Sequence, residues 1–169
     1  MSERSHDLAS KFEQMSAEVV RFTEGCSERE WRTHVPDEDR SVAYLCSHIA
    51  LGYVAETQAL KAMVSGEQTP NWSWEDLAQR NAQRWQAEPY PDQAETVARL
   101  RDATRTTAEA ICVLTEEQLE LPGSYGPIQG VGVVEFVERV ILGHPRGHLD
   151  AMRRVANGDV GFQKGDPDV

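Results

Sequence analysis

The sequence predicts an all-α protein, a four-helix bundle, and three observations lead to this prediction. Apolar residues recur at steps of three and four in long segments, which is the spacing of one face of an α-helix. Strand-like alternation of apolar and polar residues is scarce, and the sequence has no internal repeat. Loops separate the helical segments, so their apolar stripes can pack against one another in a bundle.

The first helix is expected over about residues 5–25, with Gly25 as its end. Residues 28–40 are polar and contain Pro36, so they predict a loop with one short helical turn around Trp31. The first helix, at residues 5–25, is amphipathic, and its apolar stripe consists of Leu8, Phe12, Met15, Val19 and Phe22.

The second helix is expected over about residues 39–65, ending at Gly66. It is apolar nearly all the way round, which is typical of a helix at the centre of a bundle. His48 projects away from its main apolar stripe. The neighbours on that side are Tyr44, Gly52, Ala55 and Ala59, and the small ones among them leave room for an imidazole and a ligand.

The third helix is expected to begin after Ser73, which has the character of an N-terminal cap. Pro89 and Pro91 interrupt it, because proline lacks the amide hydrogen and clashes with the preceding turn. The helix should resume after Asp92 and carry its apolar stripe to about Leu114.

The fourth helix is expected over about residues 132–157, after a Gly- and Pro-bearing loop at 115–131. Projected at about 100° per residue, its apolar residues fall on one face, and His144 and His148 lie near the middle of that stripe. Pro145 should kink the helix or widen it locally, since no amide hydrogen reaches back one turn.

Size and charge limit the possible functions. The 169 residues are predicted to form one bundle domain at 1–157, with a tail at 158–169. The net charge of −11 disfavours nucleic acid and anionic membranes as partners. Residues 41–55, the longest uncharged run, are too few to span a bilayer. With no secretory signal at the N-terminus, we expect a cytoplasmic protein.

Three of the five histidines predict a divalent metal site. His144 and His148 are four residues apart, so on a helix they lie about 40° apart on one face. Together with His48 they supply three nitrogen ligands and leave a coordination position open on the metal. Zinc is the first candidate metal, and nickel, iron and copper are alternatives. His6 and His34 lie among polar residues and are expected at the surface. No HExxH motif is present, which excludes a zincin-type protease.

The three cysteines predict reduced thiols rather than a disulfide framework, because Cys26, Cys46 and Cys112 are odd in number and widely spaced. Cys46 lies two residues from His48 in the sequence. On a helix the two side chains point about 160° apart, so we expect Cys46 not to be a fourth ligand.

At these residues the chain resembles the DinB/YfiT-like superfamily, roughly from Leu8 to Val155. The matching features are His48 in the second helix and the HxxxH formed by His144 and His148. The Trp-containing segment before the third helix and the stretch 80–84 are also similar, although they are less specific. The resemblance implies an up-down-down-up bundle, commonly a homodimer, with a divalent metal on the three histidines. Its relatives include mycothiol-dependent maleylpyruvate isomerase and other thiol-cofactor transferases or hydrolases, and many have no known reaction.

Two functions remain open. The first is a metal-dependent enzyme that acts on a small molecule through a low-molecular-weight thiol, as a transferase or isomerase, or through a metal-activated water, as a hydrolase. Tyr44 and Asn81 are candidates for binding the substrate or cofactor, whereas Glu56 is expected to face the wrong side for a general base. The second is a non-catalytic, dimeric bundle that binds a metal or small ligand.

Overall fold

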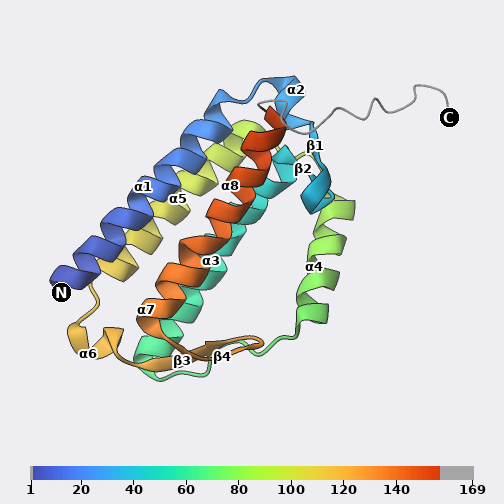
Figure 1. Ribbon diagram of the computed structural model, residues 1–169. Coiled ribbons are helices and arrows are strands. Elements are labelled where there is room, and N and C mark those ends of the chain that lie inside the picture. The colour runs from blue at the N-terminus through green and yellow to red at the C-terminus, as the bar shows by residue number, and fades with distance from the viewer. Residues whose placement is uncertain (1, 157–169) are drawn as a thin grey trace.

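The computed structural model describes residues 2–156, so the predicted tail at 158–169 lies outside the described residues. The all-α bundle is confirmed. The first and last bundle helices run in one direction and the middle two run in the other, which is the up-down-down-up arrangement (Figure 1). The bundle helices are α1 (Glu3–Gly25), α3 (Val42–Ser65), α5 (Gln93–Cys112), and the consecutive segments α7 (Val133–Phe136), η2 (Val137–Ile141) and α8 (Gly143–Ala156).

Side-chain caps and glycine conformations explain where these helices begin and end. Ser2 forms a capping box at the start of α1, and the Ser41 hydroxyl accepts a hydrogen bond from the Tyr44 amide at the start of α3. Gly66 ends α3, as predicted, with a φ of 73°, a left-handed conformation that glycine adopts readily.

Helix α3 packs at the centre of the core, as its apolar circumference predicts. Tyr53 on α3 and Phe12 on α1 are fully buried, and their rings meet edge to face with centroids 5.0 Å apart. The two polar groups nearest this contact satisfy each other, since the Ser16 hydroxyl donates to the Tyr53 oxygen at 3.0 Å. These side-chain contacts join α1 to α3 across the interior of the bundle and involve none of the histidines.

The predicted third helix is in fact two helices with different roles. Helix α4 (Trp74–Ala87) stands beside the bundle and returns the chain to the end where α5 begins (Figure 1). It contributes no buried residue, whereas α5 contributes a full apolar stripe. Pro89 and Pro91 therefore do more than interrupt a helix, because the chain reverses its direction at them. The Trp31 indole fixes this reversal by donating to the Pro91 carbonyl at 2.9 Å.

The connections contain more regular structure than the sequence predicts. The helical turn expected around Trp31 is present as α2 (Glu28–Trp31). The loop prediction for residues 115–131 is wrong, because that segment forms a short helix and most of a β-hairpin, whose tight turn includes Gly126 with a φ of 56°. The additional elements are β1 (His34–Val35), the 3₁₀ turn η1 (Pro36–Glu38), β2 (Arg40–Ser41), α6 (Glu116–Leu119), β3 (Pro122–Tyr125) and β4 (Ile128–Gly132).

The widening predicted near Pro145 occurs one turn before it. Segment η2 is a π-helix, and the Leu142 amide donates to the Val137 carbonyl at 2.9 Å, five residues back instead of four. Pro145 then occupies the first turn of α8, where a missing amide hydrogen costs little. The last bundle helix therefore contains one wide turn just before it reaches His144.

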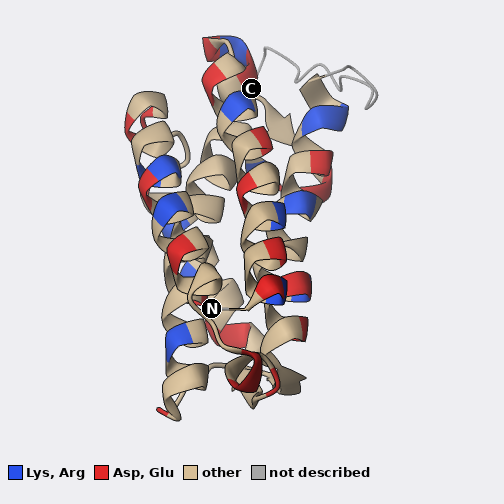
Figure 2. Ribbon diagram, turned by 90° about the vertical axis from the view of Figure 1, so that its left-hand side faces the viewer, with Lys and Arg blue, Asp and Glu red and all other residues tan. Residues whose placement is uncertain are grey.

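Charged residues of both signs alternate along the helices on the face shown in Figure 2. Most of the basic side chains in the described part of the chain pair with a neighbouring carboxylate, as Arg99 does with Glu95 and Arg153 with Glu18. None of the helices between Ser2 and Ala156 combines the length and the apolar composition that a membrane span requires.

Candidate metal centre

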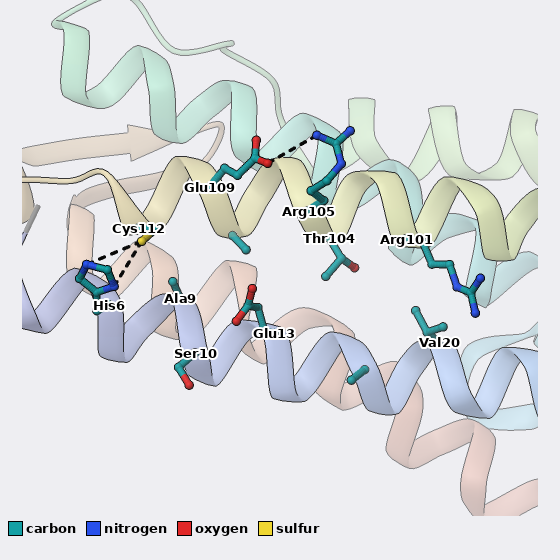
Figure 3. Close-up of a pocket in the computed structure, with 12 residues that line it drawn as sticks. His6, Ala9, Ser10, Glu13, Val20, Arg101, Thr104, Arg105, Glu109 and Cys112 are labelled. Carbon is teal, nitrogen blue, oxygen red and sulfur yellow. Dashed lines mark hydrogen bonds and ion pairs between the residues drawn. The ribbon is translucent and has the colours of Figure 1, made fainter.

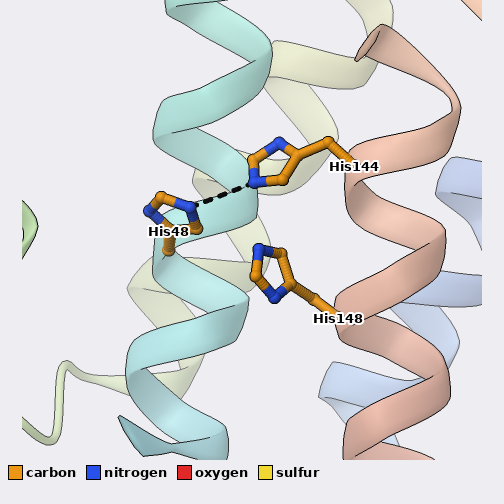
Figure 4. A group of neighbouring side chains, drawn as sticks. All are labelled: His48, His144 and His148. Atoms are coloured by element: carbon orange, nitrogen blue, oxygen red, sulfur yellow. Dashed lines mark hydrogen bonds between the residues drawn. The ribbon is translucent and has the colours of Figure 1, made fainter. Parts of the chain in front are cut away.

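The three predicted histidines meet between α3 and α8. His48 extends from α3 toward His144 and His148, which lie one turn apart on α8 (Figure 4). The Nε2 atoms of His48 and His144 are 3.1 Å apart, and one potential ligand atom from each of the three residues lies within 4.8 Å of the others. The structure thus brings together from two helices the nitrogen atoms that a single cation would require.

Two carboxylates orient the histidines of α8. His144 Nδ1 lies 2.9 Å from Glu56 Oε1, and His148 Nδ1 lies 2.8 Å from Glu38 Oε1. A carboxylate accepts a hydrogen bond at this position, so each Nδ1 carries the hydrogen and each Nε2 presents its lone pair. A carboxylate behind the imidazole in this way is the usual support of a metal-binding histidine.

Burial and the neighbouring carboxylates shift the pKa values of the cluster in opposite directions. It lowers the pKa of His48 to about 3, with further contributions from the neighbouring His144 and His148, so this imidazole is neutral at physiological pH. Burial also acts to lower the pKa of His144, but the hydrogen bond and charge of Glu56 outweigh it and raise that pKa. The hydrogen bond with His148 lowers the pKa of Glu38, which therefore remains a carboxylate.

These residues fit a divalent cation. The Nε2 atoms of His48 and His144 are 3.1 Å apart, so either His48 donates its hydrogen to His144, as the dashed line in Figure 4 marks, or the two lone pairs face each other and a cation bound by both removes the repulsion. In addition, His48 Nδ1 is buried without a hydrogen-bond partner among the described residues. A set of imidazole nitrogens suits zinc, nickel, iron and copper.

A cavity of about 420 Å³ opens beside His48 and His144. Aromatic side chains form part of its wall, among them Trp72, Trp74 and Tyr125. Gly52 borders it on α3, where a Cβ would lie 3.1 Å from His144 Cε1. Even an alanine side chain at this position would crowd His144, so glycine provides the space that the imidazole occupies.

Tyr44 and Asn81, the predicted ligand-binding residues, both lie close to His48. The Tyr44 ring stacks on the His48 ring, with centroids 6.0 Å apart and planes 10° apart, and its hydroxyl donates to the Asn81 backbone carbonyl at 2.8 Å. The Tyr44 hydroxyl therefore ties α4 to the bundle. Asn81 lines the cavity, and its buried Oδ1 has no hydrogen-bond partner in the described part of the chain.

The orientation predicted for Glu56 is wrong. Its side chain is only 3% exposed, contacts His144 and lines the cavity. The sequence does contain a signal for it, because His48, Gly52 and Glu56 follow one another at four-residue steps along one side of α3. Glu38 carries no such signal, since it comes from a polar connection whose 3₁₀ turn brings it to His148.

Cys46 lies apart from the three histidines. It is fully buried in the core, its Sγ is 3.7 Å from Met152 Sδ, and burial raises its pKa to about 12. A protonated thiol in this apolar setting is not a metal ligand. All three cysteines are free, in agreement with the expected absence of disulfides from their spacing.

A second hollow, of about 660 Å³, lies between α1 and α5 on another side of the bundle (Figure 3). It is larger than the cavity beside the histidines, but its lining residues include only one histidine, His6, and one cysteine, Cys112. Their Nδ1 and Sγ atoms are 3.4 Å apart. His6 and His34 are both exposed, as expected, and within residues 2–156 the only group suited to a metal is the one formed by His48 and the α8 pair.

Substituting Glu56 with Gln is expected to weaken metal binding about 10- to 100-fold, the usual effect of removing a carboxylate behind a ligand histidine. The amide keeps the shape of the side chain but loses the charge that supports His144. Competition with a chromophoric chelator at fixed pH measures the affinity. The exposed Glu109→Gln substitution is the control and should change nothing, whereas an unaltered affinity in Glu56→Gln would remove this role.

Comparisons with curated proteins and with solved structures gave no match. The sequence model of the DinB superfamily matches residues 11–152, which include His48 and both histidines of α8. That match covers most of the chain and spans all four bundle helices. The chain therefore belongs to the DinB superfamily.

Proposed function

We propose that the chain is a divalent-metal-dependent enzyme, with His48, His144 and His148 as the metal ligands and the adjacent cavity as the substrate site. The observation that carries this proposal is that the three histidines point toward one another beside a cavity. Two carboxylates hold the α8 histidines with Nε2 toward His48, and the cavity reaches His48 and His144 directly. Three protein ligands leave a coordination position for an exogenous group.

Zinc is our first choice of metal and nickel the alternative. When bound, a divalent ion on three neutral ligands supplies positive charge that stabilises a thiolate or a hydroxide. Thiol transfer or isomerisation through a low-molecular-weight thiol is the first candidate reaction, because it needs no nucleophile from the protein. Hydrolysis is the second, and Glu56 favours it, since its buried Oε2 has no partner within residues 2–156 and can accept a proton in the cavity.

The proposal also includes a small-molecule substrate or thiol as the partner, a homodimer as the assembly and the cytoplasm as the location. Sedimentation analysis of the purified chain measures the assembly. A monomer at micromolar concentration would remove the dimer without affecting the proposed metal site.

Turnover of metal-loaded and metal-free protein tests the proposed activity. A panel of low-molecular-weight thiols is offered 1-chloro-2,4-dinitrobenzene, so that the thiolate sulfur bonds to the ring carbon, chloride leaves and the thiol proton goes to solvent. 4-Nitrophenyl acetate tests hydrolysis in parallel. We expect zinc- or nickel-loaded protein to exceed both the metal-free protein and His48→Ala in at least one assay. Stoichiometric metal without turnover in either would favour the non-catalytic binding protein.

A further inference from the structure

Two arginines of α4 line the same cavity as the histidines. Arg80 and Arg84 are four residues apart, so they lie on one side of the helix, and both border the cavity. Arg139 of η2 borders it too, but it forms an ion pair with Glu135 four residues earlier. The cavity therefore has imidazole nitrogens in one part of its wall and guanidinium groups in another.

The chain has 28 acidic and 17 basic residues, so carboxylates outnumber the cations that could pair with them. Within residues 2–156, neither Arg80 nor Arg84 lies within 4.0 Å of a carboxylate, although Arg80 Nε donates to the Asp76 backbone carbonyl at 3.3 Å. The basic residues that do form ion pairs are Arg4, Lys11, Arg32, Arg40, Arg99, Arg101, Arg105, Arg139, Arg153 and Arg154.

The one carboxylate that lines the cavity offsets at most one of the two guanidinium charges. Glu56 is engaged with His144 through Oε1. Arg84 and His48 line this cavity together. The cavity is thus a positively charged region in an acidic protein, and such a region attracts anions.

An aromatic wall accompanies these charges. The Trp72 ring meets Tyr125 edge to face, with centroids 5.1 Å apart, and the Arg80 guanidinium lies 5.9 Å from the centre of the Trp72 ring. The Trp72 ring packs directly against Gly126 in the hairpin turn, where an added Cβ would be only 2.3 Å from the ring. A planar or apolar group can therefore lie against a wall that the fold holds in place.

We propose that this cavity binds a small organic anion, with its carboxylate or phosphate on Arg80 and Arg84 and its apolar body against Trp72 and Trp74. Guanidinium groups bind either anion through paired hydrogen bonds. The buried, unpartnered Oδ1 of Asn81 accepts a hydrogen bond from a hydroxyl or amide on the same ligand. This anion subsite does not rest on the proposed function, because none of its residues is a proposed metal ligand.

Isothermal titration of the metal-loaded full chain tests this subsite with three probes, 3-phenylpropionate, phenyl phosphate and the uncharged 3-phenylpropan-1-ol. We expect at least one anion to bind at least about ten-fold more tightly than the alcohol, the scale of a charge-assisted hydrogen bond. The carboxylate and phosphate arms identify which anion is preferred. Arg80→Gln/Arg84→Gln should reduce the preference to about one, and because α4 buries no residue the variant should fold.

Arg101→Gln/Arg105→Gln is the matched control. It removes two arginines at the same spacing, from α5 beside the other hollow, and should leave the preference intact. Equal binding of anions and alcohol, no binding of any probe, or a preference that survives Arg80→Gln/Arg84→Gln would each overturn the subsite. Metal content is measured in every variant. Loss of turnover with an intact anion preference would count against the proposed enzyme alone, and loss of the preference with intact metal would count against the subsite alone.

Discussion

Replacing His144 with Ala is expected to remove the bound divalent ion while leaving the helical content nearly unchanged. Purified wild-type protein should carry close to one ion per chain, because three imidazoles from two helices converge on one point. The variant retains two of the three ligands, which is too few for a stable site of this kind. The bundle should persist, since its core packs through other residues and the His144 side chain is 29% exposed.

Elemental analysis after dialysis measures the ion, and circular dichroism measures the helices. His148→Ala should behave in the same way, whereas His6→Ala and His34→Ala are matched controls from the exposed surface and should keep the full ion content. Equal metal content in wild type and in a variant lacking all three clustered histidines would show that the metal binds elsewhere.

Replacing Phe12 with Ala is expected to have the opposite effect to the His144 substitution: the protein loses much of its stability but keeps its metal site. Phe12 is fully buried against Tyr53, and removing a buried phenylalanine costs about 3–5 kcal/mol in the free energy of unfolding. Helix α1 contributes no histidine to the cluster. Below its unfolding temperature, the variant should therefore bind the same one ion per chain.

Urea denaturation of metal-free protein measures the loss without interference from metal binding, which would add its own stabilisation. Val113→Ala removes an apolar side chain that is 58% exposed and should change the free energy of unfolding by less than about 0.5 kcal/mol. A loss of under about 1 kcal/mol in Phe12→Ala would mean that the α1–α3 contact contributes little to the bundle.

The sequence predicted the helices best where apolar residues recur along a whole segment. Helices α1 and α3 are close to their predicted limits, because a local apolar repeat and a capping residue define them. The separate course of α4 was not predictable in the same way. Both α4 and α5 begin at a capping residue, so the local sequence predicts a helix for each. That α4 buries no residue depends on the path of the chain after α3, which is a feature of the tertiary structure. The hairpin was missed because glycine and proline indicate a turn without showing whether its flanks pair.

The candidate site divides along the same line. The spacing of His144 and His148 identifies them as candidate ligands in the sequence, because two histidines four residues apart on an apolar face are rarely needed for packing alone. The carboxylates behind them depend on tertiary structure. Glu56 belongs to the same side of α3 as His48, but only the approach of α8 shows that it supports His144. Glu38 lies in a connection and Arg84 lies on α4, which stands beside the bundle, so no periodicity in the sequence relates them to the histidines.

The π-helical turn at Val137–Ile141 determines the phase of everything that follows it. One additional residue in a turn rotates all later side chains by about 100° relative to an uninterrupted α-helix. An unbroken projection puts His144 and His148 in the middle of the apolar stripe, whereas both lie at its border, half-buried, while Leu149 and Met152 fill the core. With the wide turn, the two imidazoles lie where an incoming ligand can reach them. In an uninterrupted α-helix, the same two imidazoles would point into the core of the bundle.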